Sequence, residues 1–451
     1  MPLVYPFRAV QYAARPDLSA LVAPPYDVLD ASAKGRMLAR NGKNIVAIDL
    51  PHTPAKELGP PEAYANAAEM YHAWLADGTL KRGEKPAMFA YRQTTRTPDG
   101  KVSQRSGMAC CVEAVPFGPR EGGGILPHEE TFSGPKEDRM ALMKATRSQM
   151  SPIFGLHADE KGYATKLLQS VMTKGAPDIT ADMGDGVKHE VWTITDEQTI
   201  RAYQQALAGE DVFIADGHHR YNTALNYIKH LEAEGGKPIP ADHPARRCMM
   251  VMVGMSDPGL IIWPTHRVLG GMKDYSIDKF VEAAGKHMTI TPAGDDLSRL
   301  ETAMQAAAEG AGGRNVLGLY DAASGRTFVA TLASADPLVE KFPAKPKAWR
   351  QLDVAVIQYV LVNQIAEPVL NGGQPVKWAF PHTIKEVREI CSGSETGAGG
   401  GKAFVPQLAV IVRPTPLTAV RDVSRANELM PQKSTFFYPK IATGLFVNPL
   451  E

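Results

Sequence analysis

The chain alternates short apolar runs with longer segments in which apolar residues recur every three or four positions. Short runs of this kind are typical of buried strands. They are 45–50, 151–156, 190–194, 212–214, 248–253 and 407–412. The helical spacing predicts amphipathic helices. These are 61–76, 162–173, 196–208, 276–287, 297–308, 352–365 and 382–391.

Paired apolar runs also predict two hairpins. The first joins 87–93 to 106–112, and the second joins 315–320 to 327–332 around Ser324-Gly325. Strands mixed with helices in this order predict an α/β (mixed α+β) fold with mixed sheets and flanking helices. We expect three regions, listed here by residue number: 1–175, 176–345 and 346–451.

Composition narrows the class of protein. The 451 residues are 44% hydrophobic and 22% charged, which is typical of a globular chain. Lysine plus arginine equals aspartate plus glutamate, at 49 each, which argues against broad nucleic-acid or membrane-surface binding. No apolar run reaches transmembrane length and the first residues do not form a signal peptide, so we expect a cytoplasmic protein. The four cysteines, Cys110, Cys111, Cys248 and Cys391, are expected to be reduced core residues.

The densest group of polar residues follows the run 212–214. Asp216-Gly217 signals a turn, and apolar residues from Tyr221 onward recur at helical spacing. The sequence therefore predicts a strand, a tight turn and a helix. The start of a helix favours anions, because unpaired N–H groups and the positive end of the helix dipole point outward there. Asp216, His218, His219 and Arg220 all fall at this point, although the plainer interpretation is an Asp cap with solvated neighbours.

Three other short segments, called boxes here, are similarly rich in polar residues. They are Tyr26-Asp27; His128-Glu129-Glu130-Thr131 with Lys136, Asp138 and Arg139; and Lys433-Ser434-Thr435 with Lys440. Each of these boxes could be a solvated loop. Lys433 and Lys440 are most simply surface lysines.

Phosphoryl transfer is the chemistry that these residue types suit best. It needs cations on the phosphates, carboxylates for a divalent metal and a carboxylate that orients the attacking hydroxyl. The cations Arg220, Lys136, Arg139 and Lys433, together with His128, are the expected cofactor-binding residues. Asp216 and Glu129 are the expected metal ligands. The expected catalytic residues are Asp216, His218, His219, Glu129 and Glu130. A zinc site is less well supported, because adjacent histidines on a helix point about 100° apart.

Several boxes occur in a fixed order along nearly the whole chain. They are APPYDV (23–28), LPHEET (126–131), PKEDR (135–139), SPIF (151–154), ADGHHRY (215–221), PTHRV (264–268) and MPQKSTFFYPK (430–440). Together they resemble a bacterial and archaeal family of cytosolic proteins that is marked by these boxes. Within the DGHHR box alone, the sequence resembles the free serine kinases of the ParB/sulfiredoxin-like superfamily.

The second resemblance has implications for both fold and site. It implies a ParB/sulfiredoxin-like core around the DGHHR box. It places Asp216, His218, His219 and Arg220 at the nucleotide phosphates and the serine. Those kinases also use an upstream glutamate as catalytic base, for which Glu129, Glu130 and Asp27 are the candidates here.

The leading hypothesis is a nucleotide- and Mg²⁺-dependent phosphotransferase. It would use ATP or ADP as phosphoryl donor on a small hydroxylated metabolite, with free L-serine or O-phosphoserine as the leading substrate. One alternative is a metal-dependent, phosphatase-like hydrolase, and another is a ParB-like nucleotide-binding switch without a metabolic substrate. The expected partners are a nucleotide and a small molecule, with a possible homo-oligomer and with neither membrane nor nucleic acid. We also expect the boxes around His128 and Asp216 to converge on one pocket.

Overall fold

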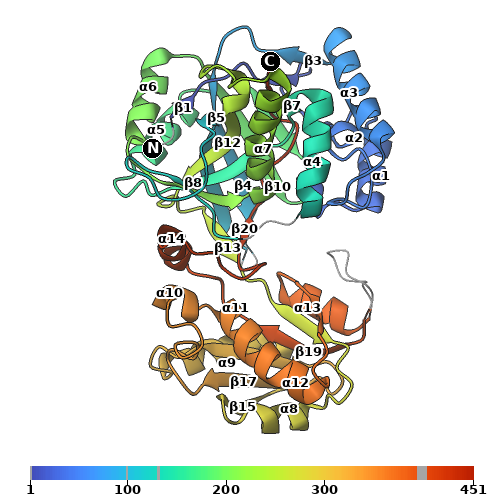
Figure 1. Cartoon of the computed structure of the whole chain (residues 1–451), viewed down its shortest axis with the longest axis vertical. Helices are drawn as coiled ribbons and strands as arrows, with labels where there is room; N and C mark the ends of the chain where they lie inside the picture. Colours follow the sequence, from blue (N-terminus) through green and yellow to red (C-terminus); the bar gives the residue numbers. More distant parts are fainter. Residues whose placement is uncertain (1–2, 98–99, 130–132, 394–403) are drawn as a thin grey trace. The chain divides into compact units, whose positions relative to one another are not determined.

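The computed structural model describes residues 3–97, 100–129, 133–393 and 404–451. The chain forms two compact units (Figure 1). Unit 1 comprises Met1–Pro127, Thr131–Ile261 and Phe437–Glu451, and unit 2 comprises His128–Glu130 and Ile262–Phe436. The limits of the units fall at other residues than the limits of the three regions expected from the sequence. Both β13 (Ile261–Trp263) and β20 (Phe436–Tyr438) lie where the chain passes between units.

Unit 1 is built on a mixed sheet of nine strands in its described part. The strand order is β6-β11-β8-β12-β5-β4-β10-β9, and β1 pairs with β5. The strands are β1 (Val4–Tyr5), β4 (Met88–Arg96), β5 (Val102–Glu113), β6 (Ile125–Leu126), β8 (Ile153–His157), β9 (Ile179–Asp182), β10 (Val187–Ile194), β11 (Val212–Asp216) and β12 (Arg247–Gly254). Two short ribbons accompany the sheet. They pair β2 (Val10–Tyr12) with β3 (Leu80–Arg82), and β7 (Ser148–Gln149) with β21 (Asn448–Pro449).

Helices flank this sheet because its strands are apolar on both faces. The helices of unit 1, not all of which touch the sheet, are α1 (Ala31–Arg40), α2 (Val46–Asp49), α3 (Pro61–Ala76), α4 (Ser133–Thr146), α5 (Tyr163–Met172), α6 (Glu197–Ala206) and α7 (His218–Gly235). Helix α5 packs on β4, β5 and β12, and α6 packs beside α5. Helix α7 packs on β8 and lies beside α4 (Figure 1). The central run of β12 is buried throughout, as its apolar sequence predicts.

Unit 2 contains a second arrangement of helices and strands, in which all strand pairs of the described sheet are antiparallel. Its sheet has the order β15-β17-β16-β19-β14-β18. The strands are β14 (Arg267–Gly270), β15 (Met288–Gly294), β16 (Val316–Asp321), β17 (Thr327–Leu332), β18 (Lys377–Ala379) and β19 (Pro406–Ile411). The helices are α8 (Ile277–Ala284), α9 (Leu300–Glu309), α10 (Lys347–Arg350), α11 (Asp353–Val356), a π-helical segment (Ile357–Ala366), α12 (Glu367–Leu370), α13 (Ile384–Cys391) and α14 (Leu417–Arg425).

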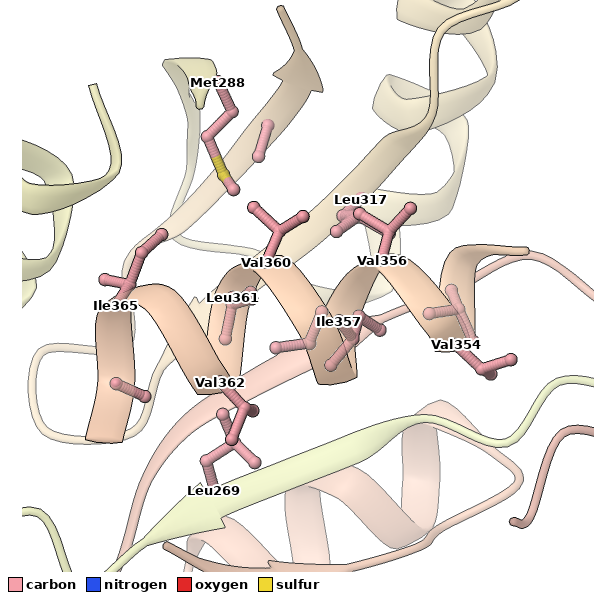
Figure 2. Close-up of a cluster of buried hydrophobic side chains, with 14 of the residues drawn as sticks. Leu269, Met288, Leu317, Val354, Val356, Ile357, Val360, Leu361, Val362 and Ile365 are labelled. Atoms are coloured by element: carbon pink, nitrogen blue, oxygen red, sulfur yellow. The ribbon is translucent and has the colours of Figure 1, made fainter. Parts of the chain in front are cut away.

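Alternate residues of the unit 2 strands enter two separate cores. Leu269 packs with the helix at 353–366, whereas its neighbour Val268 packs with α9 and α13. Successive side chains of a strand point to opposite faces of its sheet. Because both Val268 and Leu269 are buried, both faces of this sheet are covered. Figure 2 shows Val356, Val360 and Leu361 of the long helix in the first core.

Most predicted elements are confirmed, and one is wrong. The hairpins form as β4–β5 and β16–β17, and the helix predicted at 61–76 is α3. The run 45–50, expected to be a strand, is instead the short helix α2. The Asn44 side chain explains the helix, because it accepts the Val46 N–H at 2.9 Å and is itself held by the carbonyls of Ala20 and Val22, to which it donates. A short apolar run cannot by its pattern tell a buried helix from a strand.

The structure shows the state of the cysteines and the character of the helices. All four cysteines are free, and Cys110, Cys111 and Cys248 are buried in the core as expected. Within the described ranges, no helix combines the length and the apolar character needed to cross a membrane.

The core of unit 2 generates a prediction about stability. Leu361 is fully buried, so Leu361→Ala should lower the free energy of unfolding by about 2–5 kcal/mol through lost burial and a residual cavity. Val369, which is 54% exposed on the same helical stretch, provides the control, and Val369→Ala should change it by less than about 0.5 kcal/mol. Urea denaturation measures both. Equal effects of the two substitutions would contradict the placement of this helix in the core.

Candidate functional site

The strand–turn–helix predicted around Asp216 is present in unit 1. Strand β11 ends at Asp216, Gly217 adopts a left-handed conformation with φ 96°, and α7 begins at His218. A β-bulge lies between Ile214 and Asp216, so the strand bends where the polar residues begin. A Cβ atom on Gly217 would lie 3.0 Å from Nε of Arg220. Glycine is therefore required for its backbone conformation and for the close approach of the guanidinium.

Two cations hold the Asp216 carboxylate. Arg220 donates from Nη2 to Oδ2, and Lys440 donates from Nζ to Oδ1. Burial raises the pKa of the Asp216 carboxyl, but the charges of Lys440 and Arg220 outweigh burial and lower it well below its usual value. Lys440 is only 17% exposed and is not the surface lysine that its sequence context suggested. Its spacing of 224 residues from Asp216 gave no local signal.

A buried arginine holds the segment that carries Lys440. Arg105 donates to the carbonyls of Tyr438 and Pro439 and to the side chain of Gln93. Gln93 in turn donates to the Lys440 carbonyl at 2.7 Å. Burial lowers the pKa of Arg105 to about 10, and its guanidinium lies 4.5 Å from the centre of the Phe154 ring. The position of Lys440 is therefore fixed through its backbone as well as through its charge.

Arg139, expected to bind a cofactor, is engaged with protein groups. It donates to Asp138 at 2.7 Å, and to both the carbonyl and the carboxylate of Asp49, at 2.6 Å and 3.1 Å. Its guanidinium also stacks 3.8 Å from the centre of the Tyr26 ring. Tyr26 precedes Asp27, so this arginine fixes the loop that presents the Asp27 carboxylate.

The surroundings of His219 are strongly positive. Burial lowers the pKa of His219 to about 4; Asp27 opposes this change, whereas Lys56, Arg220 and Lys136 add to it. The imidazole is therefore neutral at pH 7. Oδ1 of Asp27 is buried and, among the described residues, has no hydrogen-bond partner. Lys56 was not singled out by the sequence, because it lies in a loop without a recognisable motif.

A small cavity lies behind this arrangement. Arg139, Arg220 and Asp49 line it together with apolar residues such as Met150 and Met249. Its volume is about 30 Å³, which holds ordered water but not a nucleotide. It is not a substrate pocket in this conformation.

The remaining predicted site residues fall elsewhere. His128, Glu129 and Lys433 belong to unit 2, where Glu129 accepts the backbone N–H groups of Ser434 and Thr435. Glu130 lies outside the described residues. Asp216, His218, His219, Arg220, Lys136 and Arg139 are all in unit 1. The predicted convergence of the two groups on one pocket stays a prediction.

The described residues do not fit a magnesium site made by the protein alone. Both carboxylate oxygens of Asp216 are engaged by cations, which a metal ion would have to displace. In the part of the chain that the structure describes, no three His, Cys, Asp or Glu side chains gather where they could hold a metal ion.

The double ion pair generates a prediction about stability and pH. Asp216→Asn should cost about 3–5 kcal/mol at pH 7, because it leaves Lys440 and Arg220 without their charge partner. A lowered folded pKa contributes stability above the unfolded pKa, near 3.9, and this contribution is lost as the pH falls below that value. The difference from the native protein should therefore shrink below about pH 4. Urea denaturation at pH 7 and pH 3 measures it, and the exposed pair of Lys43 with Asp77 supplies the control, Asp77→Asn, which should have little effect.

The charges around His219 generate a second prediction. In an NMR titration the His219 ring should have its midpoint near pH 4. Lys136→Met should raise this midpoint because it removes one of the repelling charges. The exposed lysine Lys237 gives the control variant, Lys237→Met. An ordinary midpoint near 6.5 in the native protein would contradict the positive field at this helix start.

Comparison with solved structures gives matches of low similarity. A free serine kinase in complex with AMP has a TM-score of 0.32 and 12% identity, covering 72% of this chain and 89% of that chain. SbnI with a C-terminal truncation, from Staphylococcus aureus, has a TM-score of 0.31 and 10% identity, covering 72% and 84%. A conserved hypothetical protein from Pyrococcus furiosus has a TM-score of 0.31 and 13% identity, covering 72% and 95%. TM-scores this low carry no argument about this chain.

Comparison with curated proteins gives no match. A family model does match, over residues 4–355, and it is described as "Protein of unknown function (DUF1015)". This match spans well over half of the sequence, and the chain therefore belongs to the DUF1015 family.

Proposed function

We propose that unit 1 is a phosphotransferase that binds nucleotide phosphates at the start of α7. It transfers a phosphoryl group between ATP or ADP and the hydroxyl group of a small metabolite, with free L-serine as the leading substrate. The same site can run in reverse from O-phosphoserine.

The observation that carries this proposal is the concentration of positive charge at the start of α7. Three cations, Lys56, Arg220 and Lys136, act on His219, opposed by Asp27. The helix dipole adds to this field, and no side chain caps the helix at Gly217. A helix start with this excess of positive charge stabilises a polyanion such as a nucleotide phosphate chain.

The residues divide between binding and positioning. Lys56 and Lys136 bind the phosphates, since the charges of both act on His219 at the start of α7. Asp216 and Lys440 are positioning residues, because Asp216 forms ion pairs with both Lys440 and Arg220. Arg220 contributes positive charge to the phosphate site from a fixed position, because its guanidinium also donates to the Pro152 carbonyl.

Asp27 is the catalytic base of this proposal. Its buried Oδ1 has no hydrogen-bond partner among the described residues, so it can accept a proton. The substrate oxygen attacks the terminal phosphorus, the bond from phosphorus to the nucleotide oxygen breaks, and the substrate proton moves to Asp27. The neutral His219 beside it exchanges hydrogen bonds with the transferred group. Glu129 is less suitable as the base, because its carboxylate is already engaged by Ser434 and Thr435.

Magnesium enters the proposal only as an ion carried by the nucleotide phosphates. Such an ion neutralises phosphate charge, as in other phosphoryl-transfer reactions. In the proposed reaction, Asp27, His219 and the lysines act through their own side chains.

The test is a phosphoryl-transfer screen of ATP, ADP and pyrophosphate against serine and related hydroxy acids. Asp27→Asn should lower kcat by about 100-fold or more while nucleotide affinity stays the same, because only proton acceptance is lost. Lys136→Met should weaken nucleotide binding by about ten-fold or more, through the loss of one charge-assisted contact. Lys237→Met is the matched control and should change neither quantity.

The alternative functions have distinct outcomes in the same experiment. Nucleotide binding with no turnover of any acceptor indicates a nucleotide-binding switch. Release of inorganic phosphate from a phosphomonoester without a nucleotide indicates a hydrolase. Either result would overturn the phosphotransferase proposal.

A further inference from the structure

A second polar cluster lies within unit 2 and has no part in the proposed reaction. It brings together residues from the boxes LPHEET, PTHRV and MPQKST. Its members are His128, Glu129, Arg267, Lys433, Ser434 and Thr435. Hydrogen-bonded partners in this cluster lie up to 307 positions apart, so no local pattern in the sequence indicated the grouping.

Three hydrogen-bond donors in this cluster meet at one oxygen atom. Oε1 of Glu129 accepts the N–H of Ser434 at 3.1 Å, the N–H of Thr435 at 3.3 Å and the Thr435 hydroxyl at 3.4 Å. Nε2 of His128 lies 3.7 Å from the same oxygen and 2.7 Å from the Thr435 hydroxyl oxygen. The residue before these donors, Lys433, has the left-handed φ of 60°. Successive N–H groups after such a residue form an anion-binding nest.

The turn that carries these donors is held from its other side. Buried Arg267 donates to the carbonyls of Gln432, at 3.4 Å, and Lys433, at 3.0 Å. Thr415 donates to the Ser434 carbonyl at 2.7 Å. Because the carbonyl groups are drawn to these partners, the N–H groups are left pointing at the Glu129 oxygen. The donors therefore form a fixed arrangement that does not depend on which anion fills it.

The electrostatics of the cluster also favour an anion. Arg267 is buried, and burial lowers its pKa to about 10, although Glu129 opposes this change. Lys433 adds an exposed positive charge at the residue that starts the turn. Among the described residues, Glu129 is paired with no lysine or arginine, and its side chain is 21% exposed.

We infer that the turn Lys433–Thr435 is a phosphate-binding site in which the Glu129 carboxylate occupies the position of a ligand oxygen. Glu129 is an intramolecular competitor that a phosphate dianion or a small phosphomonoester displaces. A phosphate fits better than a carboxylate, because one of its oxygens can occupy the Oε1 position while others face the Lys433 ammonium and the His128 imidazole. This inference does not depend on the phosphotransferase proposed for unit 1.

The test measures binding of inorganic phosphate to the full chain by calorimetry. A built-in competitor lowers the apparent affinity by the fraction of molecules in which the site is open. Glu129→Ala should therefore bind phosphate at least about ten-fold more tightly than the native chain. Glu129→Gln keeps the size of the side chain and guards against a folding defect. It should give a smaller gain than Glu129→Ala, because the neutral amide still competes for the turn, although less well than the carboxylate. Glu340, exposed in the same unit, supplies the control Glu340→Ala, which should match the native chain.

Second substitutions locate the gained site. Added to Glu129→Ala, either Thr435→Val or Lys433→Ala should remove the gain, whereas Lys136→Met in unit 1 should leave it unchanged. Loss of the gain with Lys136→Met would overturn the inference, because the phosphate would then be bound in unit 1. A folded Glu129→Ala or Glu129→Gln protein with native phosphate affinity would also overturn it and would leave Glu129 as a structural cap. Tighter binding of acetate than of phosphate would reject the ligand class, and equal gains for phosphate and a phosphomonoester would show that the phosphate group alone is recognised.

Discussion

The candidate site in unit 1 depends on the neutralisation of one buried carboxylate by two cations. Asp216 ends a strand, Arg220 lies one helical turn further on, and Lys440 comes from the end of the chain. Removing Asp216 leaves two largely buried cations without their shared partner, and removing either cation leaves Asp216 with only one of its two partners. Either loss costs more than the loss of an exposed ion pair. The last residues of the chain are thereby tied to the strand–helix junction.

Buried arginines extend this constraint to the surrounding loops. Arg105 binds the carbonyl groups just before Lys440, and Arg139 joins Asp49 and Asp138 beneath Tyr26. Arginine suits this role because its planar group donates in several directions and stays charged when buried. Two further cations, Lys56 and Lys136, lower the pKa of His219 at the start of α7. The phosphate-binding role proposed for unit 1 rests on this positive charge at the start of α7.

The two units handle a carboxylate in different ways. Unit 1 neutralises Asp216 with formal charges, whereas unit 2 satisfies Glu129 with backbone N–H groups and a hydroxyl. An ion pair buried on both sides is difficult to displace. The exchange of Glu129 for an external anion, inferred above, needs only that the donors of the turn keep their positions without it.

The sequence by itself determined the mixed α/β class, most of the elements and the strand–turn–helix at Asp216. These follow from apolar periodicity and from turn residues, which act over a few positions. It did not determine that 45–50 is helical, because that choice depends on Asn44 contacts with Ala20 and Val22. Nor could it show that Arg139, expected to bind a cofactor, instead bonds to Asp49 and Asp138. Only the tertiary structure paired Lys440 with Asp216 and Glu129 with Thr435, because pairings across hundreds of residues arise from packing and leave no period in the sequence.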